Sequence, residues 1–147
     1  MRRIITTLAA MALMFSYTAS ANAGDTFTQT INQHNVTVTS FIPIGCGGAN
    51  SLTYTATGNL VQHITVNGAG DFWFTATFEG SGTLTTGGNT YAGHLIDWFG
   101  QEENNKNGVI HATFNFVGDG LTVHGAFDTT TNANGTVTAD HFNVSCR

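Results

Sequence analysis

The stretch that decides the fold is Val109–Cys146, with the sequence VIHATFNFVGDGLTVHGAFDTTTNANGTVTADHFNVSC. In its first two segments small or apolar residues occupy every second position, and the alternate positions are mostly polar. The apolar set is Ile110, Ala112, Phe114 and Phe116, followed by Leu121, Val123, Gly125 and Phe127. A period of two with aromatic and β-branched residues is typical of half-buried β-strands. The stretch therefore predicts strands with one apolar face and one polar face.

Two short turns join these predicted strands. Gly118-Asp119-Gly120 favours a two-residue turn at either Gly118-Asp119 or Asp119-Gly120, and both put the phenylalanines of the two strands on one face. The loop Asn132-Ala133-Asn134-Gly135 is expected to have the same parity, so it brings Phe142, Val144 and Cys146 to the same apolar face. A slip of one residue would exchange the faces, so the pattern and the turns specify one register. We predict an antiparallel three-stranded meander here.

The first 23 residues have the features of a secretory signal peptide. Arg2 and Arg3 precede the mostly apolar, uncharged run Ile4–Tyr17. Ala21-Asn22-Ala23 then matches the small-x-small cleavage pattern, with Ala19-Ser20-Ala21 as an alternative site. The apolar run is too short for a membrane anchor. We therefore predict a secreted, extracellular protein with a signal peptide over residues 1–23 and no membrane span in the mature chain.

The predicted mature chain, residues 24–147, has the size of one domain and an acidic balance. Removing Arg2 and Arg3 changes the formal charge from −5 to −7 and leaves Lys106 and Arg147 as its lysine and arginine residues. Two such cations cannot form a basic patch, so we expect no nucleic-acid partner and no anionic membrane partner. Threonine in strands and Asn/Gly in turns fit a single all-β extracellular domain.

Two cysteines, Cys46 and Cys146, are present in this exported chain. Export implies an oxidising compartment, which favours one Cys46–Cys146 disulfide. The alternatives are two free thiols or a pair of metal ligands. Neither is supported by a CxxC motif or by a histidine at metal-binding spacing from a cysteine.

Further strands are expected upstream of the meander. They cover Phe27–Ile31, Val36–Ile42, Leu52–Thr57, Leu60–Val66, Phe72–Phe78, Thr83–Thr86 and Tyr91–Phe99. Leu52–Val66 is expected to be one strand bent or bulged at Gly58, and Thr83–Thr86 either continues the preceding strand or pairs back on it. Both faces of Tyr91–Phe99 are apolar, which leaves its orientation open, and Gln101–Asn107 is predicted to be a polar loop. About seven to nine short strands favour a small up-and-down β-barrel, with a β-sandwich as the alternative.

Several segments of the chain resemble a group of small secreted actinobacterial β-proteins that is functionally uncharacterised. These segments are Gly93-His94, Trp98-Phe99-Gly100, Thr113-Phe114 with Phe116, His124, Asn132–Thr138 and Cys146. The likeness covers most of the mature chain and the signal peptide, through turn and strand features. The resemblance implies export and β-architecture, and it supplies no catalytic residues to transfer.

Histidines supply the candidates for metal binding. The predicted register puts His111, His124, Asp128 and His141 on the polar face of three neighbouring strands, where imidazoles and a carboxylate could bind zinc or copper. The turn decides whether Asp128 lies opposite His111 or Val109. Because this spacing carries no specific motif, we favour a solvated face with scattered histidines and predict no metal and no cofactor.

The sequence offers little support for catalysis. It has no GxSxG, HExxH or P-loop pattern and no pairing of a cysteine with a histidine. Asp97 is the acid embedded in an apolar stretch, Leu95–Phe99, and an inward orientation would raise its pKa and make it a candidate. Acids usually stay exposed, so we expect Asp97 on the outer face, with Trp98 and Phe99 on different faces. We expect no enzyme, with a barrel enzyme using Asp97 as the alternative.

The apolar face of the sheet suggests ligand binding. Small barrels either fill their interior with side chains or hold one small ligand. We predict a small apolar ligand in the interior, in contact with Phe74, Phe114, Phe116, Gly125 and Phe127. The alternative is an extracellular structural or surface-interaction protein with a filled core. Gly125→Leu would abolish binding in the first case and destabilise by roughly 1–3 kcal/mol through overpacking in the second.

Overall fold

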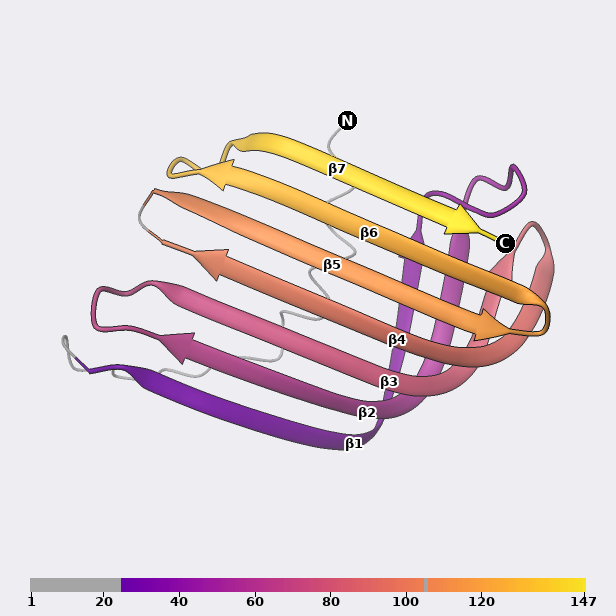
Figure 1. Cartoon of the computed structure of the whole chain (residues 1–147), viewed down its shortest axis with the longest axis horizontal. Helices are drawn as coiled ribbons and strands as arrows, with labels where there is room; N and C mark the ends of the chain where they lie inside the picture. Colours follow the sequence, from indigo (N-terminus) through magenta and orange to yellow (C-terminus); the bar gives the residue numbers. More distant parts are fainter. Residues whose placement is uncertain (1–24, 105) are drawn as a thin grey trace.

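The computed structural model describes residues 25–104 and 106–147, which form one antiparallel sheet of seven strands (Figure 1). The strands are β1 (Phe27–Ile42), β2 (Leu52–Val66), β3 (Phe72–Thr86), β4 (Asn89–Glu103), β5 (Asn107–Gly118), β6 (Leu121–Asn132) and β7 (Val137–Cys146). They lie in chain order, so the sheet is a meander. The all-β prediction is confirmed. The predicted signal peptide, residues 1–23, lies outside the described residues.

Membrane-spanning helices are not found in the described part of the chain: no helix there is long and apolar enough to cross a bilayer.

The C-terminal meander has the predicted register. Asp119 and Gly120, both with positive φ (46° and 78°), form the turn between β5 and β6, so the second of the two proposed turns is the one that forms. Phe127 consequently pairs with Ala112 on β5 and with Phe142 on β7. The phenylalanines of the three strands share one face, which we call the inner face.

The upstream strands are longer than predicted. β1 joins two predicted strands through a register shift between Gln33 and Val36, and β2 runs through Gly58 without a shift. β3 continues to Thr86, and β4 extends to Glu103, into the predicted Gln101–Asn107 loop. Backbone pairing with the neighbouring strands favours strand at these positions, although their local glycine and polar residues are typical of turns.

Glycines on the inner face allow neighbouring backbones to come unusually close. A Cβ atom added to Gly58, Gly82 or Gly118 would overlap a backbone oxygen of the adjacent strand, and one added to Gly93 would meet Val117 and Phe116. Glycine in a strand commonly marks such a bend or close approach. The strands bend strongly in this region, and the ends of β1 and β2 turn up behind β6 and β7 (Figure 1).

The bend folds the inner face onto itself at one end of the sheet. Tyr54 on β2 approaches Phe114 on β5 with ring centroids 6.0 Å apart, although β2 and β5 are not neighbours in the sheet. The core cluster is formed by Val38, Ile42, Leu52, Tyr54, Ala56, Leu60, Ala76, Phe78, Leu84, Leu95, Phe114, Phe116 and Val123. At the opposite end, which we call the open end, the inner face is only partly buried.

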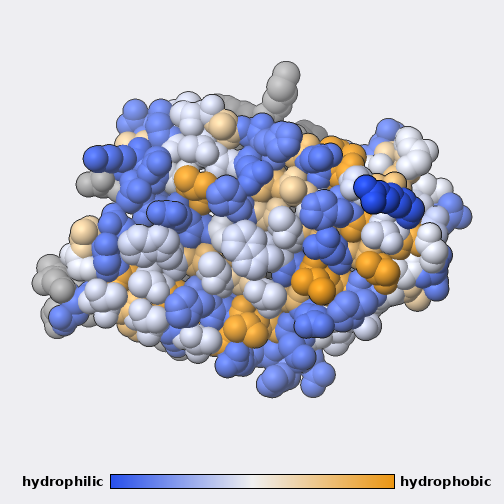
Figure 2. Space-filling model, viewed as in Figure 1, coloured by the Kyte–Doolittle hydropathy of each residue, from blue (hydrophilic) through white to orange (hydrophobic). Residues whose placement is uncertain are grey.

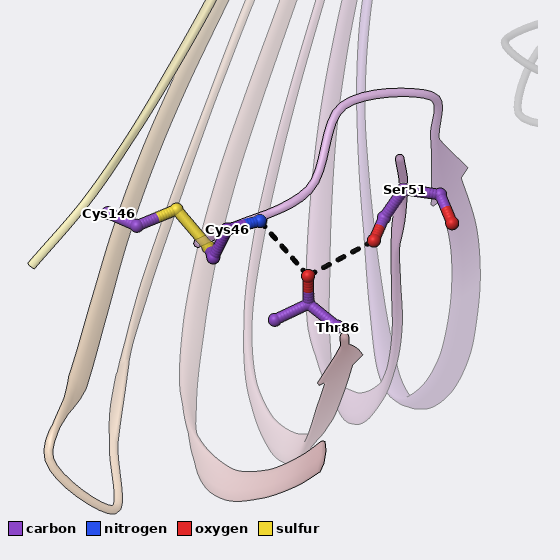
Figure 3. The surroundings of a disulfide bond; sticks show 4 residues. All are labelled: Cys46, Ser51, Thr86 and Cys146. Carbon is purple, nitrogen blue, oxygen red and sulfur yellow. Dashed lines mark hydrogen bonds between the residues drawn. A yellow bond between two sulfur atoms is a disulfide. The ribbon is translucent and has the colours of Figure 1, made fainter. Parts of the chain in front are cut away.

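The two edges of the sheet are joined by a disulfide. Among the described strands β1 pairs only with β2, and β7 only with β6, so closure into a barrel is not confirmed. Cys46, in the loop after β1, is bonded to Cys146 at the end of β7, with Cα atoms 5.7 Å apart (Figure 3). The predicted disulfide is thus found in the structure, and it spans the seam between the edges at the bent end.

Buried Thr86 fixes the loop that carries Cys46. Its Oγ1 accepts a hydrogen bond from the Cys46 backbone N–H at 3.0 Å and donates one to the Ser51 carbonyl at 3.1 Å (Figure 3). A single hydroxyl thus connects Cys46, the end of this loop and the end of β3.

Replacing both cysteines by serine should destabilise the fold by up to about 4–5 kcal/mol, because the disulfide closes a long loop in the unfolded chain. Urea unfolding of Cys46→Ser/Cys146→Ser beside the native protein measures the loss. The native protein should show no thiol that reacts with maleimide under denaturing conditions, and a reactive pair would contradict the disulfide.

Gly58→Ala should destabilise by more than about 2 kcal/mol, because the added methyl group overlaps the backbone of β3. Ser81→Ala is the matched control, since Ser81 lies on the exposed outer face of the neighbouring strand and should change stability by less than about 0.5 kcal/mol. Equal effects in urea unfolding would show that the close approach at Gly58 does not shape the sheet.

Candidate functional site

The outer face carries hydrogen-bonded polar side chains that are open to solvent. His63 Nδ1 lies 2.9 Å from Thr30 Oγ1, and His124 Nδ1 lies 2.7 Å from Asn115 Oδ1. The histidines are all exposed: His34, His63, His94, His111, His124 and His141.

The four metal-ligand candidates do not form one cluster. His111, Asp128 and His141 occupy the same row across β5, β6 and β7, and the His111 Nδ1 atom contacts the Asp128 carboxylate. His124 lies four residues from Asp128 on β6, which is about 13 Å along a strand. Within the described residues, no group of three or more His, Cys, Asp or Glu side chains is placed to hold a metal ion.

Asp97 lies on the inner face, so its predicted outward orientation is wrong. Its neighbours Ile96 and Trp98 are exposed on the outer face, whereas Leu95 and Phe99 point inward with it. The predicted separation of Trp98 and Phe99 is therefore confirmed. Leu95 is almost fully buried in the core, and strict alternation along β4 then carries Asp97 inward as well.

The Asp97 carboxyl is held by Tyr54 in apolar surroundings. The Tyr54 hydroxyl donates a hydrogen bond of 2.7 Å to Asp97 Oδ2, and Phe78 and Phe114 flank Asp97 in register. Burial raises the pKa of Asp97 from 3.8 to about 6, while hydrogen bonds from Tyr54 and from the Trp98 backbone lower it in part. Burial, and then the Asp97 charge, raise the pKa of Tyr54. The pair combines a phenol that stays protonated with a carboxyl that exchanges its proton near neutral pH.

Five phenylalanines continue the inner face toward the open end. Phe74 lies between Phe72 and Phe99, with ring centroids 6.4 Å and 5.8 Å away, and Phe127 meets Phe142 edge to face at 6.2 Å. All five are partly buried. We call them the inner aromatic surface: Phe72, Phe74, Phe99, Phe127 and Phe142.

A small residue separates the two groups of rings. Ala112 on β5 pairs with Phe99 on one side and with Phe127 on the other. With only a methyl group at this position, β5 places little bulk between the two groups of rings at this row. Aromatic faces around small residues form a suitable lining for an apolar guest.

The predicted ligand contacts divide between the core and this surface. Phe114 and Phe116 are core residues, 6% and 1% exposed. The Phe114 ring fills the place where a side chain at Gly125 would lie, so Gly125 provides no free space. Phe74 and Phe127 belong to the inner aromatic surface. Phe99 was missed among the contacts because both faces of Tyr91–Phe99 are apolar in sequence, whereas the alternation around Phe72 and Phe142 could have found them.

A separate depression of about 250 Å³ lies at the edge between β6 and β7, on the outer face. Its lining residues are Thr122, His124, Ser145 and Arg147. Its four lining residues all carry polar or charged groups, unlike the phenylalanines of the inner face.

Comparisons with known proteins give no match to a family model, a curated protein or a solved structure. The resemblance to secreted actinobacterial proteins therefore stays a prediction.

Asp97→Asn should make the protein more stable at pH 8 and leave it nearly unchanged at pH 4. In the folded state Asp97 keeps its proton up to about pH 6, whereas in the unfolded chain it ionises near 3.8. The folded state binds more protons between these values, so this group lowers the free energy of unfolding as pH rises from about 4 to 6, and the loss persists above. The expected gain at pH 8 is about 1–3 kcal/mol.

Urea unfolding at both pH values measures the effect of Asp97→Asn. Glu102→Gln, at an exposed position on the outer face of the same strand, is the control for the loss of one negative charge. A variant that is no more stable than the native protein at pH 8 would contradict the burial cost assigned to Asp97.

Proposed function

We propose that this protein is an exported, non-enzymatic binding protein that holds a small, mainly apolar molecule against the inner aromatic surface. One observation carries the proposal: five phenylalanine rings remain partly buried on the inner face, beyond a core in which the same face is fully packed. The signal-peptide pattern and the disulfide support export.

The arrangement of the rings supports a guest that touches both groups. Phe74 and Phe99 lie on one side of Ala112, and Phe127 and Phe142 lie on the other. Contact with both groups would remove apolar surface of the protein and the guest from water, with roughly 25 cal/mol gained per Å². Because the sheet edges are joined at the bent end, a molecule would approach from the open end.

Binding fits the surroundings of Asp97 better than catalysis does. Its in-register neighbours, Phe78 and Phe114, offer neither a nucleophile nor a second acid, and Tyr54 already occupies one of its oxygens. A carboxyl in such surroundings can orient a bound molecule through one polar contact.

The competing function is a structural or surface-interaction protein, and the packing of Phe114 against Gly125 favours it. Its interaction surface would have to be the outer face. Exposed apolar residues there include Val61, Trp73, Ile96, Trp98 and Val117. Figure 2 shows separate apolar groups with hydrophilic residues between them rather than one broad apolar patch. Scattered apolar residues of this kind are normal on protein surfaces, so we place binding on the inner face.

Ala112→Leu should weaken binding of the neutral probe neopentylbenzene about tenfold or more, because the larger side chain fills the space between the two groups of rings. Titrations followed by amide NMR shifts on the oxidised mature protein give the affinities. Thr77→Leu, on the exposed outer face, is the matched control and should leave binding unchanged.

Phe127→Leu tests the same surface without filling it, since it removes a ring and keeps Ala112. It should also weaken the binding of neopentylbenzene. If the native protein shows no saturable binding, or if both Ala112→Leu and Phe127→Leu bind like the native protein, the interior is not the binding site and the surface-interaction function takes its place.

A further inference from the structure

The charged residues of the inner face all have one sign. Asp97, Glu103 and Asp140 occupy inner-face positions, with Glu103 paired in register with Phe72 and Asp140 hydrogen-bonded to Thr129 at 3.0 Å. Within the described strands no lysine, arginine or histidine occupies an inner-face position. The histidines lie on the outer face. Lys106 lies in the β4–β5 turn, and Arg147 follows β7.

Asp97 borders the inner aromatic surface. It lies two residues from Phe99 on the same face of β4, at the boundary between the packed core and the partly buried rings. Tyr54 donates to Oδ2 from the core side. The carboxyl is partly buried rather than sealed in the core, so a group resting on the rings can approach it.

We propose that the ligand is a small organic cation with an apolar body, such as a quaternary or protonated amine, whose charged group lies near Asp97. This inference rests on the proposed function and names the ligand class for the same site. The faces of aromatic rings are negative and attract cations, and aromatic cages are an established environment for substituted ammonium groups. A carboxylate beside the rings adds attraction between opposite charges. The apolar body would lie on the rings between β4 and β6.

Charge complementarity separates a cation from other guests. An anion would leave water to face Asp97, Glu103 and Asp140 with no basic partner on the inner face, which is costly. A neutral guest gains from apolar burial alone. A cation with an apolar body gains from apolar burial and also from its attraction to the carboxylates. The formal charge of −7 on the predicted mature chain attracts it over longer distances.

Binding of a cation should be tighter at pH 8 than at pH 5. Burial raises the pKa of Asp97 to about 6, so its carboxylate is charged at pH 8 and mostly protonated at pH 5. The other titratable groups on this face near the site are Tyr54, Glu103 and Asp140. A quaternary ammonium ion does not titrate, so a change in its affinity over this range reports on the protein.

Benzyltrimethylammonium and neopentylbenzene are the two probes, since they have the same shape and differ in a positive nitrogen in place of a carbon. At pH 8 the native protein should bind the cation about tenfold more tightly than the neutral probe. At pH 5 this preference should shrink, while the affinity for neopentylbenzene stays constant. NMR titrations at low salt measure all four affinities.

Two substitutions on the inner face and one control on the outer face locate the effect. Asp97→Asn should remove most of the preference for the cation and keep the affinity for the neutral probe. Glu103→Gln and Glu102→Gln form a matched pair, because these neighbours on β4 point to opposite faces and lose the same charge. Glu103→Gln should reduce the preference for the cation more than Glu102→Gln does.

The outcomes distinguish this inference from the function on which it rests. If neopentylbenzene binds the native protein and the cation binds no more tightly, the ligand class is wrong and the proposed function stands. If neither probe binds, the proposed function fails, and the inference fails with it. A preference for the cation that survives Asp97→Asn and Glu103→Gln would overturn the role given to the inner-face acids.

Discussion

The fold depends on the close approach of strand backbones at the inner-face glycines. A sheet with one apolar face must cover that face with another layer, and in most domains a second sheet or helices provide it. Here the described chain consists of one sheet, which supplies the second layer from its own strand ends. Gly58, Gly82 and Gly118 permit this because a side chain at any of them would collide with the next strand.

Bending at one end buries the inner face unevenly. Strand ends that turn back can cover only part of it, so Phe116 is buried whereas Phe127, on the same face, is partly exposed. The disulfide holds the covered end together, at the seam between β1 and β7. Asp97 lies where these two environments meet, which explains how one carboxyl can be desolvated by the core and still border an accessible aromatic surface.

Part of this arrangement could be predicted from the sequence, for local reasons. Alternation and glycine turns specify the register of β5–β7, since strand parity and turn length agree. The disulfide follows from two cysteines in a chain whose sequence predicts export. Closure of a barrel depends on contacts between β1 and β7, at opposite ends of the chain, and no local pattern reports on them.

The candidate site was less predictable because space and orientation are properties of the packed interior. A glycine in an apolar row looks like free volume, but at Gly125 the Phe114 ring occupies it. The sequence Leu95-Ile96-Asp97-Trp98-Phe99 allows either orientation, and only the burial of Leu95 decides that Asp97 points inward. That the charged residues at inner-face positions of the described strands are all acidic emerges only when the registers of the whole sheet are known.

The order of the strands also bears on how the sheet can form. Every pairing joins strands that are consecutive in the chain, so each hairpin can form as soon as its two strands have emerged. Cys46 and Cys146 are 100 residues apart, and the second lies at the end of the last strand. In the folded sheet they meet at the seam between β1 and β7, at the bent end. Because each hairpin can form without this bond, its presence reports on the bending of the whole sheet, which no single pairing of neighbouring strands does.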